Sequence, residues 1–511
     1  MGFISADRRQ KDLIGYSLED FIPKDAKCRF IVDIVSQLNL KKLYNHYSPQ
    51  GADAYDPSIM LSTWFYGYTE GVTSTRKLEK LCKRDMHFIY VSANLRPDHC
   101  SFSRFRKDHL HLFPYYFEQI IRIARQRGYS DFKVIATDSS RIHARSSVKK
   151  SKDSDKLARY LTAVRKDIQE YIELCELDEL DDEPADDQKE IKKNLQRLRK
   201  LEKTLIKRQH QLDERKKQIK KEYRDKHQIN ITEPDAYLMN HVNGKQSAPA
   251  YNAQVSVDTK TQLIVAQDVV QDRNDRKQFS IQHQAVEKNI GKDTERKHIN
   301  DSGYHSLEQL EYIEENQVNA TIADPTLVNK PKTSTQSPEE IQKQARRLKK
   351  SDFSYHADGD YFTCPVGEKL TFTRYNTQKN RPGRQYRASN CNGCKLKSQC
   401  LASYNKSGLR SIFRDEKEHL SEKMRQKLQT EDAKQKLKLR SITVEPVIGN
   451  LKSNLGFRRF HLMGLLNVKG EFTLMCIAHN LNKLYGLLLC FYFLIFFKIY
   501  QDDLDKNRIF I

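Results

Sequence analysis

A long polar segment separates the apolar parts of this chain and limits how it can fold. Residues 150–230 are dominated by Lys, Glu, Arg and Gln. Apolar residues recur in this segment at a strict spacing of seven, at Ile191, Leu198, Leu205, Leu212 and Ile219. That spacing predicts a long helix with one apolar stripe, and the acidic break ELDDEPADD predicts a helical hairpin. Because polar residues occupy the partner positions of the stripe, we expect a solvated insertion and not a strong coiled coil.

Strand-like sequence lies on both sides of this segment, so the core must be assembled from separate pieces. The apolar run Lys133–Thr137 ends at Asp138, and Tyr251–Asp258 alternates apolar and polar residues, which predicts one buried and one polar face. The run LIVAQDVV follows a turn and is apolar on both faces, which predicts a central strand. Two more short strands are expected at His298–Asn300 and Val318–Ala323, with helices before and between them. The order is that of a mixed α/β fold.

Residues 1–130 have the pattern of a helical domain. Asp56 and Pro57 form an N-cap and first-turn pair, and Ser74 starts a second helix after Gly71. The stretches TRKLEKLC and RPDHCSFSRFRKDHL predict short helices joined by a tight turn, a pattern similar to a helix-turn-helix. Basic side chains of this region are candidates for binding DNA, namely Arg76, Arg96, Arg104 and Arg106. A helical bundle with a solvated basic face fits the same residues.

The charge of the chain points to a polyanionic partner. Lys and Arg number 89 against 67 Asp and Glu, a formal net charge of +22, and nucleic acid is the simplest partner for such a chain. The 150–230 segment is then a DNA or protomer contact without catalytic residues. The N-terminus lacks the apolar core of a secretory signal, so a cytoplasmic location is expected. With no phosphate-loop or dinucleotide-binding motif, no nucleotide cofactor is expected.

Four cysteines cluster in a second polar, lysine-rich segment at residues 326–435. Cys364, Cys391, Cys394 and Cys400 have the spacing C-x26-C-x2-C-x5-C, and the close pair has the separation that tetrahedral Zn²⁺ prefers. A closed structural zinc site is one interpretation. The other is a set of reduced or redox-labile thiols packed in a small β-rich insert.

Three acidic residues stand in unlike settings and predict the chemistry. Asp138 and Asp301 each follow a strand-like run, so both can lie where strands end. Glu445 is expected on a helix that Thr443 caps, with Pro446 in its first turn, and Lys452 follows two turns later. Carboxylates from distant segments suit a pair of Mg²⁺ ions, which take oxygen ligands and leave sites for water and phosphate. Phosphodiester chemistry is implied. Taken singly, such residues are also common as turn residues, helix caps or surface ion pairs.

Several motifs together resemble the DDE transposases of bacterial insertion sequences. They are DSS after the first strand, YNAQVSVD…LIVAQDVVQDRNDRKQF, DSGYHS, RPDHCSFSRFR and VEPVIGNLKSNLGFRRFHLMGLLNVKGEFTLMCIAHNLNKL. The resemblance implies an RNase H-like core with a mixed five-stranded sheet and with Asp138, Asp301 and Glu445 as ligands of two Mg²⁺ ions, for which Mn²⁺ can substitute. It also implies residues that position DNA near the metals, namely Tyr304, Arg440, Lys452, Arg458 and Arg459. In related transposases the arginine stands four residues before the glutamate, whereas Arg440 stands five before it.

The resemblance implies strand cleavage at the ends of the element, followed by attack of the freed 3′-hydroxyl on target DNA. The partners are then double-stranded terminal inverted repeats and target DNA, bound by a homo-oligomer, simplest as a dimer, in a bacterial cytoplasm and on the nucleoid when DNA is bound. Two alternatives remain, a nuclease of the same fold that does not join strands, and a decayed or domesticated transposase that only binds DNA.

The predicted domain organisation is discontinuous. A helical DNA-binding domain (1–130) precedes a catalytic core built from 131–150, 231–325 and 436–486, which is interrupted by the helical insertion (151–230) and the Cys-containing insertion (326–435). The tail 487–511 departs from the family pattern. Its apolar run Leu487–Phe497 is shorter than the ~20 residues of a membrane span, so a buried helix is expected, and no membrane partner; an altered reading of a decaying element is the alternative.

Overall fold

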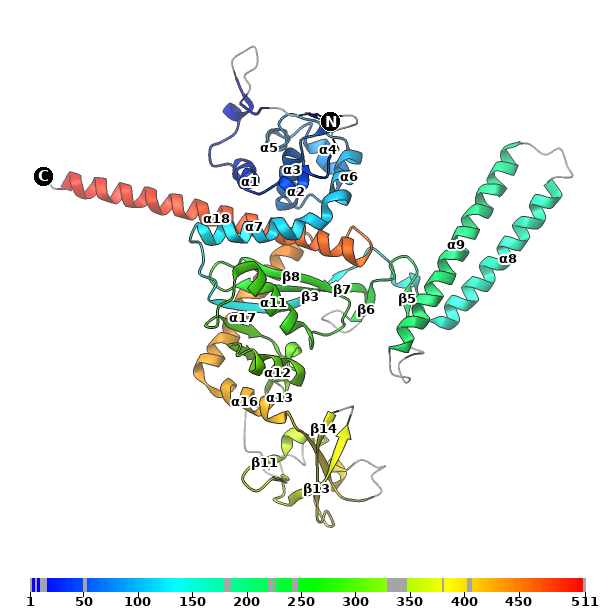
Figure 1. Cartoon of the computed structure of the whole chain (residues 1–511), viewed down its shortest axis with the longest axis vertical. Coiled ribbons are helices and arrows are strands. Elements are labelled where there is room, and N and C mark those ends of the chain that lie inside the picture. Colours follow the sequence, from blue (N-terminus) through cyan, green and yellow to red (C-terminus); the bar gives the residue numbers. More distant parts are fainter. Residues whose placement is uncertain are drawn as a thin grey trace. The chain divides into compact units, whose positions relative to one another are not determined.

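The chain forms two compact units in the computed structural model (Figure 1). The first unit comprises Met1–Asn274, Gln282–Lys292 and Ile442–Ile511, and the second comprises Asp275–Ile281 and Asp293–Ser441. The structure describes residues 2–4, 7–9, 16–48, 53–178, 185–218, 224, 227–240, 247–328, 347–378, 381–401 and 407–508. Strands and helices occur in both units, which confirms the predicted mixed α/β class.

The N-terminal part of the first unit is helical, as predicted. Its helices are α1 (Lys27–Ser36), α2 (Lys41–Tyr44), α3 (Pro57–Thr69), α4 (Thr75–Leu81), α5 (Met86–Val91), α6 (His99–His109) and α7 (Phe113–Gln126). The Asp56 carboxylate caps α3 by accepting a hydrogen bond from the Ser58 N–H at 2.8 Å. Gly71, with φ of +67°, turns the chain after α3, and Ser74 caps α4. Every residue of α3 except Ser58 is buried, so the other helices pack around it.

A twisted antiparallel sheet forms the middle of the first unit. Its strands are β3 (Val134–His143), β6 (Tyr237–Asn240), β7 (Ser247–Asp258) and β8 (Ile264–Val270). The central strand is β7, which pairs with β3, β6 and β8. The expectation that the LIVAQDVV strand is central was wrong, because among the described strands β8 pairs with β7 alone.

The polar residues of β7 are buried, which corrects the prediction of one polar face. Gln254 and Ser256 are fully buried, and the Ser256 hydroxyl donates to Gln282 at 3.0 Å and lies 2.9 Å from the Thr137 hydroxyl. Hydrogen bonds of this kind remove the cost of burying a hydroxyl group. The alternation of apolar and polar residues in the sequence therefore reflects two faces of β7 that are both buried but differ in polarity.

The heptad segment forms the predicted helical hairpin. Helices α8 (Ser154–Asp178) and α9 (Ala185–Lys217) lie side by side (Figure 1), above the short strands β4 (Ser151–Lys152) and β5 (Ile229–Asn230). Leu205 and Leu212 of the stripe are fully buried against apolar residues of α8. Ile219 and residues 179–184 of the acidic break lie outside the described part of the chain.

The C-terminal helix α18 spans Leu465–Arg508. Its HNLNKL motif supports the sheet, because Asn480 accepts from the Ile264 N–H and donates to the Ile264 carbonyl, both at 2.8 Å. The Asn480 side chain thus forms hydrogen bonds with both backbone groups of Ile264 on the edge of β8 that faces away from β7. Of the predicted buried run Leu487–Phe497, Leu489 and Cys490 are exposed, contrary to the prediction, and side chains beyond residue 490 are outside those the structure describes. No helix in the described residues meets the length and hydropathy needed to span a membrane.

The second unit contains the strand pair β9 (Lys297–Asn300) and β10 (Ala320–Ile322) and a separate five-stranded sheet. Strands β9 and β10 are parallel and are connected through α12 (Leu307–Glu315), as predicted. Helices α13 (Pro325–Val328) and α16 (Glu418–Gln429) follow, and α16 packs on α12. Helix α11 (Gln278–Ile290) contributes residues to both units.

The cysteine-containing segment forms a separate antiparallel sheet, which we call the cysteine domain (residues 347–415). Its strands are β11 (Ser354–His356), β12 (Tyr361–Thr363), β13 (Lys369–Gln378), β14 (Arg381–Ala388) and β15 (Ser411–Asp415). The short helix α15 (Lys397–Cys400) lies between β14 and β15 in the sequence. The β-rich character expected for this segment is confirmed.

Candidate functional site

Asp138 lies in the middle of β3 and not at its end. Strand β3 pairs with β7 from Ile135 to His143 without a break in register, so hydrogen bonding continues past the small residues that suggested a turn. Asp138 is half-buried and stands opposite Val255. Its carboxylate accepts a hydrogen bond from the Ser139 N–H at 2.7 Å. The predicted strand was therefore correct, but its predicted end was wrong.

Glu445 lies near the end of a long helix and not at the start of a short one. Helix α17 (Glu431–Gly449) begins well before Thr443, which is buried, so Thr443 is no N-cap. Pro446 is inside the helix, where it removes one backbone hydrogen bond. The chain continues into a π-helical turn at Asn450–Asn454, and Gly456 then adopts φ of +74°. Glu445 itself is exposed.

Asp138 and Glu445 belong to the same face of the sheet in the first unit. A small cavity is lined from β3 by Ser140 and Ile142, and from the residues after Glu445 by Ile448 and Lys452. Strand side chains alternate between faces, so Asp138 shares the face of Ser140 and Ile142. Glu445 stands about one helical turn before Ile448. Asp138 thus lies on the face of β3 against which the residues after Glu445 pack.

Cations lie beside this face at the end of the π-helical turn. The half-buried Lys452 ammonium donates to the Arg141 carbonyl at 3.0 Å, and burial, with Arg141 and Arg458 nearby, lowers the pKa of Lys452. Arg458 donates to the Lys452 carbonyl at 3.1 Å and keeps an exposed side chain, as does Arg459. Exposed guanidinium groups suit the recognition of phosphates.

Asp301 lies in the second unit, immediately after β9, as predicted. Its carboxylate caps a short 3₁₀ turn (Ser302–Tyr304) by accepting from the Gly303 N–H at 2.9 Å. A second acid is close, because a Cβ atom on Gly303 would meet Asp301 at 3.0 Å and Asp275 at 3.4 Å. Burial raises the pKa of Asp301, Asp275 raises it further, and the nearby Arg440 lowers it.

Asp275 is the residue that sequence reasoning missed. It is not among the acids that the sequence singles out, although it lies in the QDRNDRKQF stretch of the quoted motifs. Its place beside Asp301 adds a carboxylate to the acidic site of the second unit.

Two residues predicted to touch DNA are buried. Arg106 is on the inner face of α6, where its guanidinium stacks over Trp64 at 4.6 Å and donates to the Thr73 carbonyl at 3.2 Å. Tyr304 is fully buried in the apolar core of the second unit. Both corrections follow from packing, which the sequence does not show at single positions. Arg76, Arg96 and Arg104 are exposed, as a DNA-binding surface requires.

The chemistry of the carboxylates fits a hard divalent cation, since all their ligand atoms are oxygen. Asp138 and Glu445 belong to the first unit and Asp301 to the second. Within the described residues, no three His, Cys, Asp or Glu side chains form a group arranged to hold a metal ion. The candidate site is therefore a set of three acidic residues, which do not form a closed coordination shell in the described part of the chain.

Comparison with protein families identifies the class. Residues 363–485 match a family described as a transposase DDE domain, and residues 16–108 match a transposase domain family designated DUF772. Both matches are to transposases. More particularly, they support a DDE-type transposase of an insertion sequence, as the motifs indicated. No curated protein matches the chain.

The matched ranges correspond to parts of the structure already described. The first contains Glu445, the four clustered cysteines and the HNLNKL motif, and it ends at Tyr485, before the apolar run. The second contains Arg76, Arg96 and Arg104. Asp138 and Asp301 lie outside both ranges, so their roles rest on the motifs around them.

Proposed function

We propose that this transposase cleaves DNA strands at the ends of an insertion sequence and joins the freed 3′-hydroxyl to target DNA. The observation that carries the proposal is the placement of Asp138 and Glu445 on one face of β3 in a chain that matches a transposase DDE domain. The two acids come from segments distant in sequence, and a common ligand for both is the role we propose for the face that they share.

Asp138, Asp301 and Glu445 are the proposed ligands of two Mg²⁺ ions, with Mn²⁺ as a substitute. When bound, such ions activate an attacking oxygen and stabilise the leaving oxygen of a phosphodiester. Asp275 adds negative charge beside Asp301. Lys452, Arg458 and Arg459 supply positive charge next to β3, where they would hold the phosphates of the strand being cut.

Two exposed basic surfaces are proposed to hold the rest of the DNA. The first is the face of the N-terminal helices that carries Arg76, Arg96 and Arg104, which would recognise the terminal inverted repeats. The second is a stripe on α9. At about 100° per residue, one side of α9 gathers exposed cations, namely Lys192, Lys193, Arg199, Lys200, Lys203 and Lys207. Glu202 is on the other side, where it pairs with Arg165 of α8 at 2.8 Å.

A homo-oligomer, simplest as a dimer, is part of the proposal, because both ends of an element must be cut in one complex. We propose that the protein acts in the bacterial cytoplasm, on double-stranded DNA. The RNase H-like identity of the sheet and the treatment of the α8–α9 hairpin and the cysteine domain as insertions belong to the same proposal.

The test is cleavage and joining of an end-labelled duplex that carries the element's terminal repeat, with Mg²⁺. Glu445→Gln and Asp138→Asn should abolish cleavage and leave binding of the duplex nearly unchanged. Glu431→Gln is the matched control, since Glu431 is an exposed acid at the other end of the same helix. Cleavage without joined product would identify a nuclease, and binding without cleavage by the wild type would identify a decayed, DNA-binding protein.

A further inference from the structure

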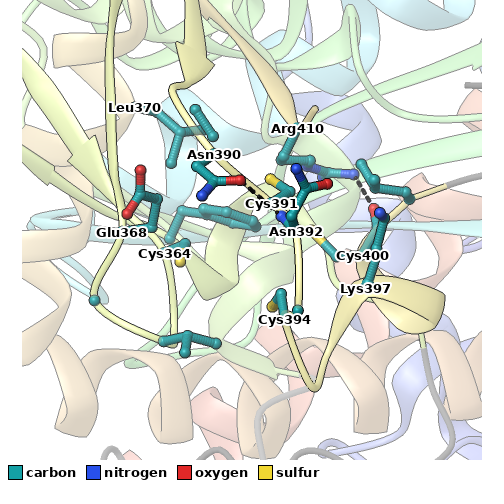
Figure 2. A pocket seen from close by; sticks show the side chains of 16 residues that line it. Cys364, Glu368, Leu370, Asn390, Cys391, Asn392, Cys394, Lys397, Cys400 and Arg410 are labelled. Atoms are coloured by element: carbon teal, nitrogen blue, oxygen red, sulfur yellow. Dashed lines mark hydrogen bonds between the residues drawn. The ribbon is translucent and has the colours of Figure 1, made fainter. Parts of the chain in front are cut away.

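Four cysteines from three separate segments line one cavity of the cysteine domain (Figure 2). Cys364 follows β12, Cys391 and Cys394 lie in the turn after β14, and Cys400 ends α15. The cavity has a volume of about 440 Å³. The fold therefore gathers thiols that are up to 36 residues apart (400 − 364) around one space.

The backbone around these cysteines forms tight turns. The Gly367 N–H donates to the Cys364 carbonyl at 2.9 Å, and Gly367 has φ of +94°. Gly393, between Cys391 and Cys394, has φ of +68°. Glycine tolerates these conformations better than other residues. Both cysteine-bearing turns are thus built by glycines that let the chain reverse next to the cavity.

The cysteine domain has a small apolar core for a five-stranded sheet. Its core consists of eight buried residues, namely Leu348, Phe353, Phe362, Leu370, Tyr386, Ala388, Leu396 and Ile412. Strand β13 is exposed along most of its length. Domains of this size gain little stability from their core alone, and many natural ones add a disulfide or a metal. The cysteines that line the cavity are all free thiols and form no disulfide.

We propose that Cys364, Cys391, Cys394 and Cys400 bind one structural Zn²⁺ ion as thiolates and that this ion holds the cysteine domain together. Four sulfur ligands make a closed tetrahedral site without an open position for catalysis. This inference goes beyond the proposed function, since it concerns a site that takes no part in cutting or joining DNA.

The surroundings of the cavity suit thiolates. The guanidinium of Arg410 lines the cavity, donates to the Cys400 carbonyl at 2.7 Å and lies 5.2 Å from the Phe353 ring. A fixed cation there would offset the negative charge of a zinc ion with four thiolates.

The sulfurs do not yet have the geometry of a coordination shell, since no group of three potential ligands in the described residues is arranged around a metal position. Protonated thiols have no attraction that would draw them together. Zinc displaces the protons and forms bonds of about 2.3 Å to each sulfur. Metal binding is therefore expected to contract the cavity.

The experiment is the metal content of the full-length protein, purified under reducing conditions with zinc in the medium. Wild type should contain about one zinc ion per chain, and the double variant Cys391→Ser/Cys394→Ser should lose it. Cys100→Ser is the matched control, because Cys100 is an exposed thiol on α6, far along the chain from the cluster. It should keep its zinc.

A second measurement guards against a double variant that fails to fold. Zinc in the wild type is replaced by Co²⁺, and four thiolates should give an intense thiolate-to-cobalt charge-transfer band together with the visible bands of a tetrahedral ion. Wild type that neither contains zinc nor takes up Co²⁺ with this spectrum overturns the proposal, and so does a double variant that keeps its zinc. None of these readouts depends on DNA cleavage, so failure of the proposed function would leave the zinc result intact.

Discussion

The first unit and the cysteine domain differ in the interactions that stabilise their folds. The first unit buries one continuous cluster that joins the N-terminal helices, the β3–β7–β8 sheet and α18. The cysteine domain buries only eight apolar residues and gathers four thiols instead. Burial of apolar surface scales with size, so a small sheet gains much less from it. We therefore expect the two regions to depend on different interactions for their stability.

The single tryptophan makes this comparison measurable. Trp64 is the one tryptophan of the chain, and it is fully buried in α3 of the first unit. Its fluorescence reports on unfolding of the first unit, whereas tryptic cleavage within residues 347–415 reports on the cysteine domain. Zinc removal and changes at Glu471 or His479 are each expected to change one of these signals and to leave the other nearly constant.

The largest expected effect is the opening of the cysteine domain when zinc is removed. Structural zinc sites contribute on the order of 10 kcal/mol in small domains, so a zinc chelator should expose residues 347–415 to trypsin, with cleavage at basic residues of β13 and β14. The Trp64 unfolding transition in urea should stay where it is. Equal resistance to trypsin with and without chelator would show that the small core suffices.

The next largest effect is expected from Glu471, which lies in the large core. Its fully buried carboxylate accepts from the His461 and Leu462 N–H groups at 3.0 and 2.9 Å. Glu471→Ala leaves these donors without partners, at a cost of about 3–5 kcal/mol. The Trp64 transition should move to lower urea, and tryptic cleavage of the cysteine domain should be unchanged. Glu431→Gln, at an exposed acid, is expected to shift neither signal.

The sequence predicted the elements of both regions better than it predicted their ends and partners. The helical hairpin, the β9–α12–β10 order and the Asp56 cap depend on local patterns of spacing and capping, and all are present. The end of β3 at Asp138 and the start of α17 at Thr443 were wrong, because pairing with β7 and packing along α17 extend both elements past residues that favour turns and caps.

For the candidate site, too, local sequence motifs identified the residues, whereas contacts between distant segments determine how those residues are placed. The motifs singled out Asp138, Asp301 and Glu445, but the orientation of Asp138 and Glu445 toward one face depends on which residues follow them in the packed structure. Arg106 illustrates the converse. It lies among other basic residues in sequence, yet the spacing that it shares with Phe102 and Phe105 places it in the core above Trp64.

Acid should weaken the first unit through buried histidines. Burial lowers the pKa of His479 to about 4, and the neutral ring is held between the Gln262 carbonyl at 2.9 Å and the Asn450 side chain at 3.0 Å. The unfolded chain, with an ordinary histidine pKa near 6.5, takes up the proton first. Stability is therefore complete above about pH 6.5 and is lost as the pH falls toward 4, by up to about 3 kcal/mol for this residue.

His479→Gln should make the Trp64 transition less sensitive to pH between 6.5 and 4. The pH dependence should not vanish, because burial also lowers the pKa values of His109 and His227, in the same unit, to about 4. His419→Gln is the control, since His419 is exposed on α16. A His479→Gln protein with the pH dependence of the wild type would mean that the ring can take up a proton without leaving its two hydrogen bonds.

Replacing the cations of the stripe on α9 is expected to have the smallest effect on stability. Its effect on DNA binding can be measured separately. Lys200, Lys203 and Lys207 are exposed, so replacing all three by Gln should leave both the Trp64 transition and tryptic cleavage unchanged. If each contacts a phosphate, the slope of log affinity against log salt concentration should become less steep by about 3. The matching triple change to Arg keeps the charge and should keep the slope. An unchanged slope in the Gln variant would assign the stripe to solvent and leave the N-terminal helices, with Arg76, Arg96 and Arg104, as the remaining basic surface for DNA.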